Sequence, residues 1–410
     1  PYVIRPLAQK PFKLMPDKIT AAGPGRIRAL NRKAVLSYIR KHGPTPRSDL
    51  IPALKLSAAA VSSVTSELMS NGLLRTAPPE VSANLAARGR PKSPLEFNPS
   101  AVYAFGMRLL PFDDQCRIQM AWIDYAGQVN HLPTQNFKNS HHVDGMIDAI
   151  TTVIASIEDA VPDKSKIRAA TIAIPGVASN NQVLIAPSLQ AIKGRGFHLA
   201  ISHQVNYPIS LFNDVNLAVL SELHTQYRLS QTNFAYLYIG SGVGAGIGLQ
   251  GSWWRGSGWA GEIGHLRISR NTGSTASFED LLRTDSTFTE EIRRLGLAAD
   301  DLDGLAQADA NGNSDTSALL NNYAQTLFEL VLVLGSVLGL DEVIIDFPSE
   351  SLFSRLLPRV IASMATQPIR IVISTPANRD VAAVQGAAIA ALDIALEHIE
   401  ASSTRQSTAS

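Results

Sequence analysis

Apolar residues at helical spacing define three short segments in the first part of the chain. Residues 26–42 form a predicted helix ended by Gly43-Pro44, with one apolar face made of Ile27, Leu30, Ala34, Val35, Tyr38 and Ile39. A second helix is predicted to begin near Pro46. Ser57 caps a third, whose apolar stripe is Val61, Val64, Leu68 and Met69. Three short helices with a brief turn before the third are typical of a helix-turn-helix.

Two strand-like segments, 73–76 and 94–97, follow the third helix and flank a polar loop. The loop carries Arg88, Arg90 and Lys92. A thin cationic loop between two strands is a wing, which can enter a minor groove where A·T-rich tracks concentrate negative potential. We therefore predict a winged helix-turn-helix domain over 26–98, preceded by a flexible basic arm over 1–25.

From residue 101 the pattern changes to strands separated by helices. The first half is predicted to hold an antiparallel meander over 101–137, helices at 142–160, 197–206 and 215–225, and buried strands at 167–176 and 209–214. The second half repeats this order, with strands at 233–240, 242–251, 341–346 and 369–375, helices within 278–340 and a final helix at 380–399. Two similar α/β halves with a cleft between them are expected.

The charge is divided unevenly along the chain. Residues 1–100 contain 16 Lys and Arg against 5 Asp and Glu, whereas the remainder contains 20 against 30, so a net charge of +1 hides a basic front and an acidic body. This division indicates a nucleic-acid-binding head on a different kind of domain. A basic, solvated tail is the alternative.

Composition narrows the class of protein. Apolar residues make up 45% of the chain and charged residues 17%, as in ordinary globular proteins. The single cysteine, Cys116, excludes a disulfide framework and any multi-cysteine metal site. The longest apolar run, 328–340, is too short to cross a bilayer. We expect a cytoplasmic protein without a membrane partner.

The third helix offers small side chains for DNA contact. Its cap and predicted exposed early positions are Ser57, Ala58, Ala59, Ser62, Ser63 and Thr65. None of these is an Arg, Asn or Gln able to read a base through two hydrogen bonds. Phosphate contacts and wing insertion are therefore expected to supply much of the affinity. A helical module that docks another protein is the alternative.

Four stretches of this sequence, taken in order, resemble the ROK family (repressors, open reading frames and kinases), especially its transcriptional regulators. They are "LSAAAVSSVTSELMSNGLL" followed by "GRPKSPLEFNP"; "IPGV" with "APSL"; "FNDVNLAVLSE"; and "IGSGVGAGIGLQGSWWRGSGWAGEIGH". The resemblance covers about 26–398 and implies an actin-like, ribonuclease H-like, two-lobed α/β sugar-kinase fold behind the winged head. Its lobes are expected at 99–226, with helix 380–399 packing back on it, and at 227–379. Residues 400–410 are expected to be disordered.

The same resemblance implies a sugar pocket. It places Asp214 as the base that would take a proton from a sugar hydroxyl, a carboxylate that can equally accept a hydrogen bond without reaction. The other implied sugar-binding residues are Gly176, Asn213, Glu262, His265 and Glu279.

Two of the three nucleotide segments of the family are altered in this chain. Where the family has an Asp-x-Gly-x-Thr turn, the chain retains Gly106 but has Met107, Arg108 and Leu109. Where the family has a Gly-Gly turn, it has Asp346-Phe347-Pro348, which is expected to add bulk and negative charge. The loop of Gly240, Ser241, Gly242 and Gly244 still resembles a vestigial phosphate loop. We predict negligible sugar phosphorylation.

The family commonly holds a structural zinc with the Gly-His histidine and three following cysteines. After His265 this chain offers only hydroxyl, amide and guanidinium side chains up to Ser277, and zinc needs four good ligands. We predict no zinc, a His265 free to orient on sugar or backbone, and a loop held instead by hydrogen bonds and by Phe278, Leu281 and Leu282.

These observations favour a sugar-responsive regulator, most simply a repressor of carbohydrate uptake or catabolism genes, that binds operator DNA as a homodimer or a dimer of dimers and takes a sugar effector. An active ROK sugar kinase with an accessory head is the second hypothesis. A ligand-independent architectural DNA binder is the third.

Overall fold

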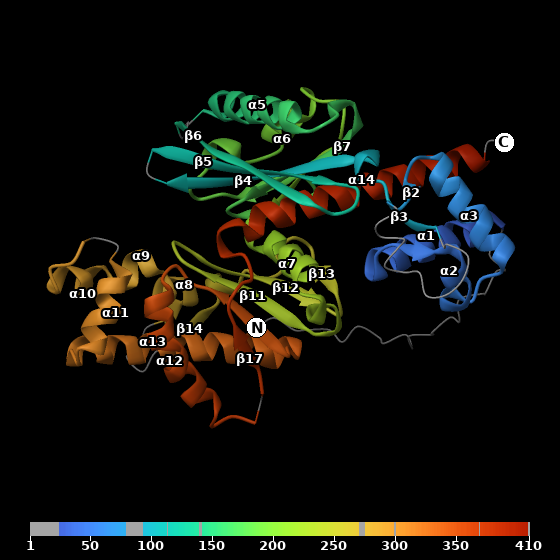
Figure 1. Ribbon diagram of the computed structural model, residues 1–410. Coiled ribbons are helices and arrows are strands. Elements are labelled where there is room, and N and C mark those ends of the chain that lie inside the picture. Colours follow the sequence, from blue (N-terminus) through green and yellow to red (C-terminus); the bar gives the residue numbers. More distant parts are fainter. Residues whose placement is uncertain are drawn as a thin grey trace, which may run out of the picture. The chain divides into compact units, whose positions relative to one another are not determined.

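The computed structural model describes residues 24–78, 93–112, 114–138, 142–269, 275–298, 301–368 and 370–408. The chain divides into two units, a head made of Pro1–Asn98 with Glu400–Ser410 and a body made of Pro99–Ile399. Most of the predicted arm and the wing residues Arg88, Arg90 and Lys92 lie outside the described residues. Figure 1 gives the element labels used below.

The head contains three helices and a small antiparallel sheet. The helices are α1 (Pro24–His42), α2 (Arg47–Leu54) and α3 (Ala58–Ser70), and the strands are β1 (Thr45–Pro46), β2 (Leu74–Thr76) and β3 (Pro94–Phe97), in the sheet order β1-β3-β2. The Ser57 side chain accepts a hydrogen bond from the Ala60 amide, which confirms the predicted cap of α3. Strand β1 was not predicted, because two residues without alternation carry no periodic signal.

Fewer residues of α1 are buried in the core of the head than the apolar pattern predicted. Val35 and Ile39 of α1 are buried, together with Val61, Val64 and Leu68 of α3. By contrast, Ile27 and Leu30, placed on the same predicted face, are 49% and 57% exposed. The first turns of α1 therefore extend past the part of the helix that packs on the rest of the head.

The body contains two sheets with one topology. The first has the order β6-β5-β4-β7-β10 and the second the order β13-β12-β11-β16-β17, each with three antiparallel strands followed by two parallel ones (Figure 1). The first sheet is made of β4 (Tyr103–Phe112), β5 (Gln115–Asp124), β6 (Val129–Lys138), β7 (Ile167–Ile174) and β10 (Ile209–Asn213). The second is made of β11 (Phe234–Ile239), β12 (Val243–Leu249), β13 (Ser252–Trp254), β16 (Glu342–Asp346) and β17 (Val372–Ser374). This confirms the predicted repetition of two α/β halves.

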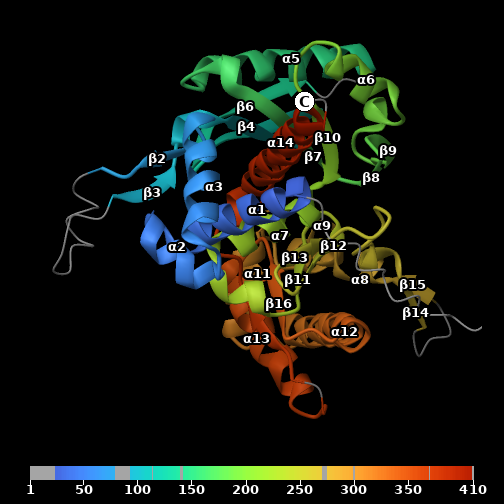
Figure 2. The ribbon, with the colours of Figure 1, turned by 90° about the vertical axis from the view of Figure 1, so that its right-hand side faces the viewer.

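Helices cover both faces of each sheet. On the first sheet, α5 (Val143–Ala160) and α6 (Gly196–Ser202) pack on one face, and α14 (Ala382–Thr408) approaches the other (Figures 1 and 2). Helix α7 (Asp214–Thr225) packs against the second sheet through Val215, Ala218 and Val219. The opposite face of that sheet is covered by α11 (Leu302–Ala310), α12 (Ser314–Leu338) and α13 (Glu350–Met364).

Smaller elements complete the body. They are the hairpins β8 (Val177–Ser179)–β9 (Gln182–Ile185) and β14 (Arg267–Ser269)–β15 (Thr275–Ser277), and the helices α8 (Phe278–Leu282), α9 (Thr284–Thr287) and α10 (Thr289–Arg294). Gly176 directly precedes the first hairpin, and Glu279 follows the second by two residues.

Helix α14 explains a glycine that was read as part of a nucleotide turn. A Cβ atom at Gly106 would lie 2.3 Å from the backbone nitrogen of Ala388, so only glycine lets the helix approach β4 this closely. The stretch Arg379–Ile399 is long and apolar enough to span a bilayer, but 61% of its most apolar window is buried in the fold, as in a core helix.

The expected disorder of residues 400–410 is wrong for most of that segment, since α14 continues to Thr408. Once a helix is nucleated, each added residue gains one backbone hydrogen bond, and Ala401, Arg405 and Gln406 belong to residue types that favour the helical conformation.

Candidate effector site

Asn213 and Asp214 lie at the junction of β10 and α7, at the carboxyl end of a parallel strand. Asn213 caps α7, because its side-chain oxygen accepts from the Asn216 amide at 2.9 Å. Its side-chain nitrogen donates to the Gly176 carbonyl at 2.9 Å. Gly176 has φ +145°, and a Cβ there would lie 2.1 Å from the Ile185 carbonyl oxygen. Both residues therefore hold the junction together, a structural role that the sequence analysis did not assign to them.

Asp214 forms an ion pair with Arg108 of β4. Arg108 donates from Nε at 3.1 Å and from Nη2 at 2.8 Å to the same carboxylate oxygen, Oδ2. The other oxygen, Oδ1, accepts from the Val215 amide at 3.0 Å. The side chains of Arg108 and Asp214 are only 14% and 8% exposed. Burial by itself lowers the pKa of Arg108, but the charge and hydrogen bonds of Asp214 outweigh it, so the pKa is raised and the guanidinium stays charged.

The parallel register explains how these two residues meet. Arg108 lies opposite Ala173 of β7, and Ala173 lies opposite Phe212 of β10, so Arg108 is level with the end of β10 where Asp214 begins α7. The sequence analysis noted only that Arg108 replaces part of a phosphate-binding turn. It did not identify this residue as the partner of the vestigial base.

Glu262, His265 and Glu279 lie together, as the resemblance implied. Nε2 of His265 is 3.6 Å from Glu262, and its Nδ1 is 3.7 Å from Glu279 of α8. Burial raises the pKa of Glu262; the nearby charges of Glu279 and Asp214 add to the rise and His265 opposes it. Three carboxylates thus face one region around an imidazole whose side chain is 59% exposed. Carboxylates and imidazoles are suitable partners for the hydroxyl groups of a polyol.

The described residues on either side of the loop after His265 are joined by hydrogen bonds. Strand β14 pairs with β15 from Arg267↔Ser277 to Ser269↔Thr275, and Arg267 donates to the Thr275 carbonyl at 2.6 Å. Ser277 and Asp280 form a capping box at the start of α8. Phe278 and Leu282 are fully buried, while Leu281 is only partly so. Across the described part of the chain, no group of three His, Cys, Asp or Glu could hold a metal ion, so these residues do not fit the family's zinc.

The residues expected around a nucleotide contact other side chains of the protein. Tyr238 lies against the phosphate-loop candidate, since a Cβ at Gly240 would be 2.4 Å from its hydroxyl oxygen. Burial raises the pKa of Tyr238, so its hydroxyl remains protonated. Asp346 accepts from the Tyr236 hydroxyl at 2.9 Å and forms an ion pair with Arg379 at 3.3 Å.

The expected bulk of Phe347 in this region is wrong. Its side chain is fully buried in the core of the second sheet, because the chain turns after β16 and directs the ring toward Tyr323 and Phe353.

In the head, five of the six predicted helix positions for DNA contact are exposed: Ser57, Ala58, Ala59, Ser62 and Ser63. Thr65 is wrong, because it is fully buried. Its hydroxyl donates to the Val61 carbonyl at 2.8 Å and accepts from Nε of Arg47 at 2.9 Å. Thr65 therefore links α3 to α2 and is not available to a ligand.

The ROK family profile matches residues 116–394. The xylose repressor of Bacillus spizizenii is 24% identical over 247 residues, which cover 60% of this chain and 62% of that protein. The match therefore spans less than two thirds of the length of that relative.

Two solved structures share the fold. A ROK family transcriptional regulator, a homologue of the E. coli MLC protein, has a TM-score of 0.74 at 20% identity and covers 91% of this chain and 98% of its own. A ROK family glucokinase from Streptomyces griseus, in complex with glucose and AMPPNP, has a TM-score of 0.56 at 18% identity over 70% of this chain and 99% of its own. Because regulators and kinases share the body fold, the fold alone does not distinguish the two functions, and the residues of the site must be compared.

Proposed function

We propose that this chain, which belongs to the ROK family, is a sugar-responsive transcriptional repressor whose body binds a sugar or sugar derivative without phosphorylating it. The head binds operator DNA, and a homodimer brings two heads to a pseudopalindromic site. Sugar binding in the body changes the arrangement of the heads, with a coupling set by the difference in sugar affinity between the two states.

The observation that carries the non-enzymatic part of this proposal is the Arg108–Asp214 ion pair. A general base has to be free to receive the proton of the attacking hydroxyl. Here two donors of Arg108 and one backbone amide already occupy the carboxylate. An ionised carboxylate has about four lone-pair positions, so one is left for a sugar hydroxyl. Asp214 can thus recognise a sugar through a hydrogen bond while being unsuited to activate it.

The nucleotide side supports the same conclusion. Transfer of a phosphoryl group needs backbone donors and a metal that neutralises the developing charge. In this chain the Tyr238 side chain packs against Gly240. The carboxylate of Asp346 is committed to Tyr236 and Arg379. The protein's own side chains therefore contact the groups that a nucleotide would need.

Binding without turnover is tested by two measurements on one panel of sugars. Calorimetry of the full chain should show saturable heat for at least one pentose or hexose. A coupled assay of ATP consumption with the same sugars should show no turnover above the background of the Asp214→Asn variant. Turnover that depends on Asp214 would establish the kinase alternative instead.

Sugar affinity should also depend on pH through Glu262. The ionised carboxylate accepts hydrogen bonds from the sugar, so affinity falls as Glu262 becomes protonated. Because the pKa of Glu262 is raised above the ordinary value of 4.5, this fall begins at a higher pH than for an ordinary glutamate. Protonation of this group favours the folded state, because its pKa is higher there than in the unfolded chain. The loss of affinity is therefore not a loss of fold.

Calorimetry between pH 7.5 and pH 5 measures this dependence. Glu262→Gln should flatten the profile. His265→Asn should retain it, which separates the carboxylate from the neighbouring imidazole. A profile that is unchanged in Glu262→Gln would assign the titration to another group.

A further inference from the structure

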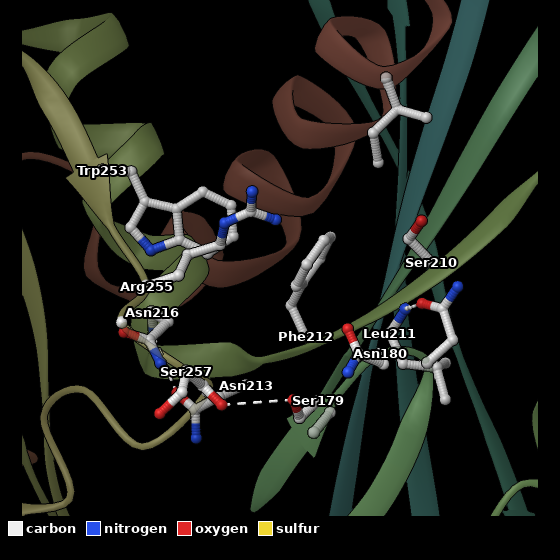
Figure 3. A pocket seen from close by; sticks show the side chains of 15 residues that line it. Ser179, Asn180, Ser210, Leu211, Phe212, Asn213, Asn216, Trp253, Arg255 and Ser257 are labelled. Atoms are coloured by element: carbon white, nitrogen blue, oxygen red, sulfur yellow. Dashed lines mark hydrogen bonds between the residues drawn. The ribbon is translucent and has the colours of Figure 1, made fainter. Parts of the chain in front are cut away.

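A cavity of about 490 Å³ opens between the two sheets of the body, away from most of the residues discussed above (Figure 3). The first sheet contributes the end of β10 and the tip of the β8–β9 hairpin, and the second contributes Trp253 and the segment Arg255–Gly258. Asn213 is shared with the candidate effector site, but Asp214, Glu262, His265 and Glu279 do not line this cavity. Its volume lies in the range of small-molecule sites.

Two buried polar atoms in the wall of this cavity have no hydrogen-bond partner among the described residues. One is the acceptor Oδ1 of Asn216, a residue that is only 5% exposed, and the other is the donor Nε1 of Trp253. Figure 3 shows both side chains on the same side of the cavity. An unsatisfied buried polar atom costs roughly 1–3 kcal/mol. Both atoms lie behind the surface of the cavity, so they add polarity to its wall without contacting a bound ligand directly.

The charge of the cavity is positive. Arg255 is the one charged residue among the described residues that line it. No carboxylate among these lining residues neutralises its charge. Its guanidinium carbon lies 5.1 Å from the centre of the Trp253 ring and 5.5 Å from that of Phe212, so the two aromatic rings hold the cation in place (Figure 3). A fixed arginine without a carboxylate partner favours a carboxylate or phosphate on the ligand.

We propose that this cavity is a second ligand site, which takes a small polyhydroxylated anion, either a sugar acid or a sugar phosphate. Neutral polar groups of Ser179, Asn180, Ser210 and Ser257 surround the space and match the hydroxyls. The ligand also spans the two halves of the body, where the Ser179 hydroxyl already donates to the Ser257 carbonyl at 3.2 Å. Occupation of the site therefore favours the arrangement of the two halves seen here.

Calorimetry with the full chain tests this site, using gluconate, glucose 6-phosphate, glucose and inorganic phosphate as separate probes. Gluconate or glucose 6-phosphate should bind, and the comparison of the two distinguishes carboxylate from phosphate. Arg255→Met keeps the apolar length of the side chain over the rings and should weaken that binding at least tenfold. Ser257→Glu, at an exposed position, should weaken it similarly by placing a negative charge beside Arg255.

A control separates this site from surface charge in general. Arg195→Met removes another exposed arginine of the body, outside the cavity, and should leave the binding of the anion within about twofold of the wild type.

The proposal is overturned if neither hydroxylated anion binds, if inorganic phosphate binds as tightly as they do, or if Arg255→Met and Ser257→Glu leave the affinity unchanged. A failure of neutral sugars to bind the wild-type chain at all would count against the proposed function, and not against this second site.

Discussion

Asp214→Asn should lower the affinity of the body for its sugar by roughly 100-fold, which corresponds to ~2.7 kcal/mol. The substitution replaces a charged acceptor by a neutral amide at the point where the sugar hydroxyl donates. It also leaves the buried guanidinium of Arg108 without its counter-charge, since the two side chains are 14% and 8% exposed. The sugar site therefore loses both a hydrogen bond and its fixed geometry.

Operator binding should remain within about twofold of the wild type in the same variant, measured by fluorescence anisotropy with labelled operator DNA. The head is a separate unit with its own core, so a change at position 214 leaves the residues proposed to contact DNA in place. The effect of sugar on operator binding, however, should disappear. Loss of operator binding in the absence of sugar would show that Asp214 supports the DNA-binding form itself.

A double variant separates sugar recognition from the stability of the fold. Breaking a buried ion pair from one side is more destabilising than replacing both partners by neutral groups. Arg108→Met with Asp214→Asn should therefore recover most of the thermal stability that Asp214→Asn loses. It should not recover sugar binding. Glu290→Gln, an exposed carboxylate on α10, serves as the matched control and should change neither quantity.

Local patterns predicted most of the elements of this fold. Alternating and helical spacings located the strands and helices of both halves, and the order of strands in the two sheets repeats as expected. The cap at Ser57 followed from the preference of serine for a helix start. Such features depend on neighbours in the sequence, so one sequence was enough.

Features that depend on distant partners were missed. Arg108 and Asp214 are 106 residues apart and meet only because three parallel strands bring them level. The β1 strand exists because β3 pairs with it, and Phe347 is buried because of the direction of the turn after β16. In each case the deciding contact comes from a segment far along the chain.

Thr65 was an avoidable error. It lies four residues after Val61 and three before Leu68, so helical spacing already placed it on the buried stripe of α3. Its polar side chain was taken as a reason for exposure, whereas a buried threonine hydroxyl can donate to the carbonyl four residues earlier, as it does here. Periodicity is the stronger guide at such a position than polarity.

The largest loss of stability is expected at Asp309, in the helical layer behind the second sheet. Its side chain is completely buried and receives three hydrogen bonds: from Oγ of Ser317 at 2.5 Å, from Nε of Arg355 at 2.6 Å and from Nη2 of Arg359 at 2.8 Å. These partners belong to α12 and α13, so Asp309 of α11 joins three helices. Removing one member of a buried charge network typically costs about 3–5 kcal/mol. Arg355 and Arg359 are 41% and 23% exposed and water can solvate them once Asp309 is gone, so the lower end of this range is expected.

Asp309→Ala should therefore lower the unfolding temperature of the body by roughly 10 °C. Differential scanning calorimetry of the full chain measures this shift. Asp159→Ala is the matched control, because that carboxylate is 78% exposed and lies 3.7 Å from the exposed Lys164, a geometry that contributes little. A shift of less than about 3 °C for Asp309→Ala would mean that the helices are held mainly by their apolar faces.

The Asp309 carboxylate also makes the stability of the fold depend on pH. Burial alone would raise the pKa of Asp309, but the hydrogen bonds from Ser317, Arg355 and Arg359 outweigh it, and the pKa lies below its ordinary value of 3.8. A carboxylate with a depressed pKa in the folded state stabilises the fold above the pKa of the unfolded chain, and this contribution is lost as the pH falls through the folded value. The difference in unfolding temperature between wild type and Asp309→Ala should therefore be full at pH 7 and should shrink below about pH 4. A difference that stays constant down to pH 3 would assign the loss to packing rather than to the charge.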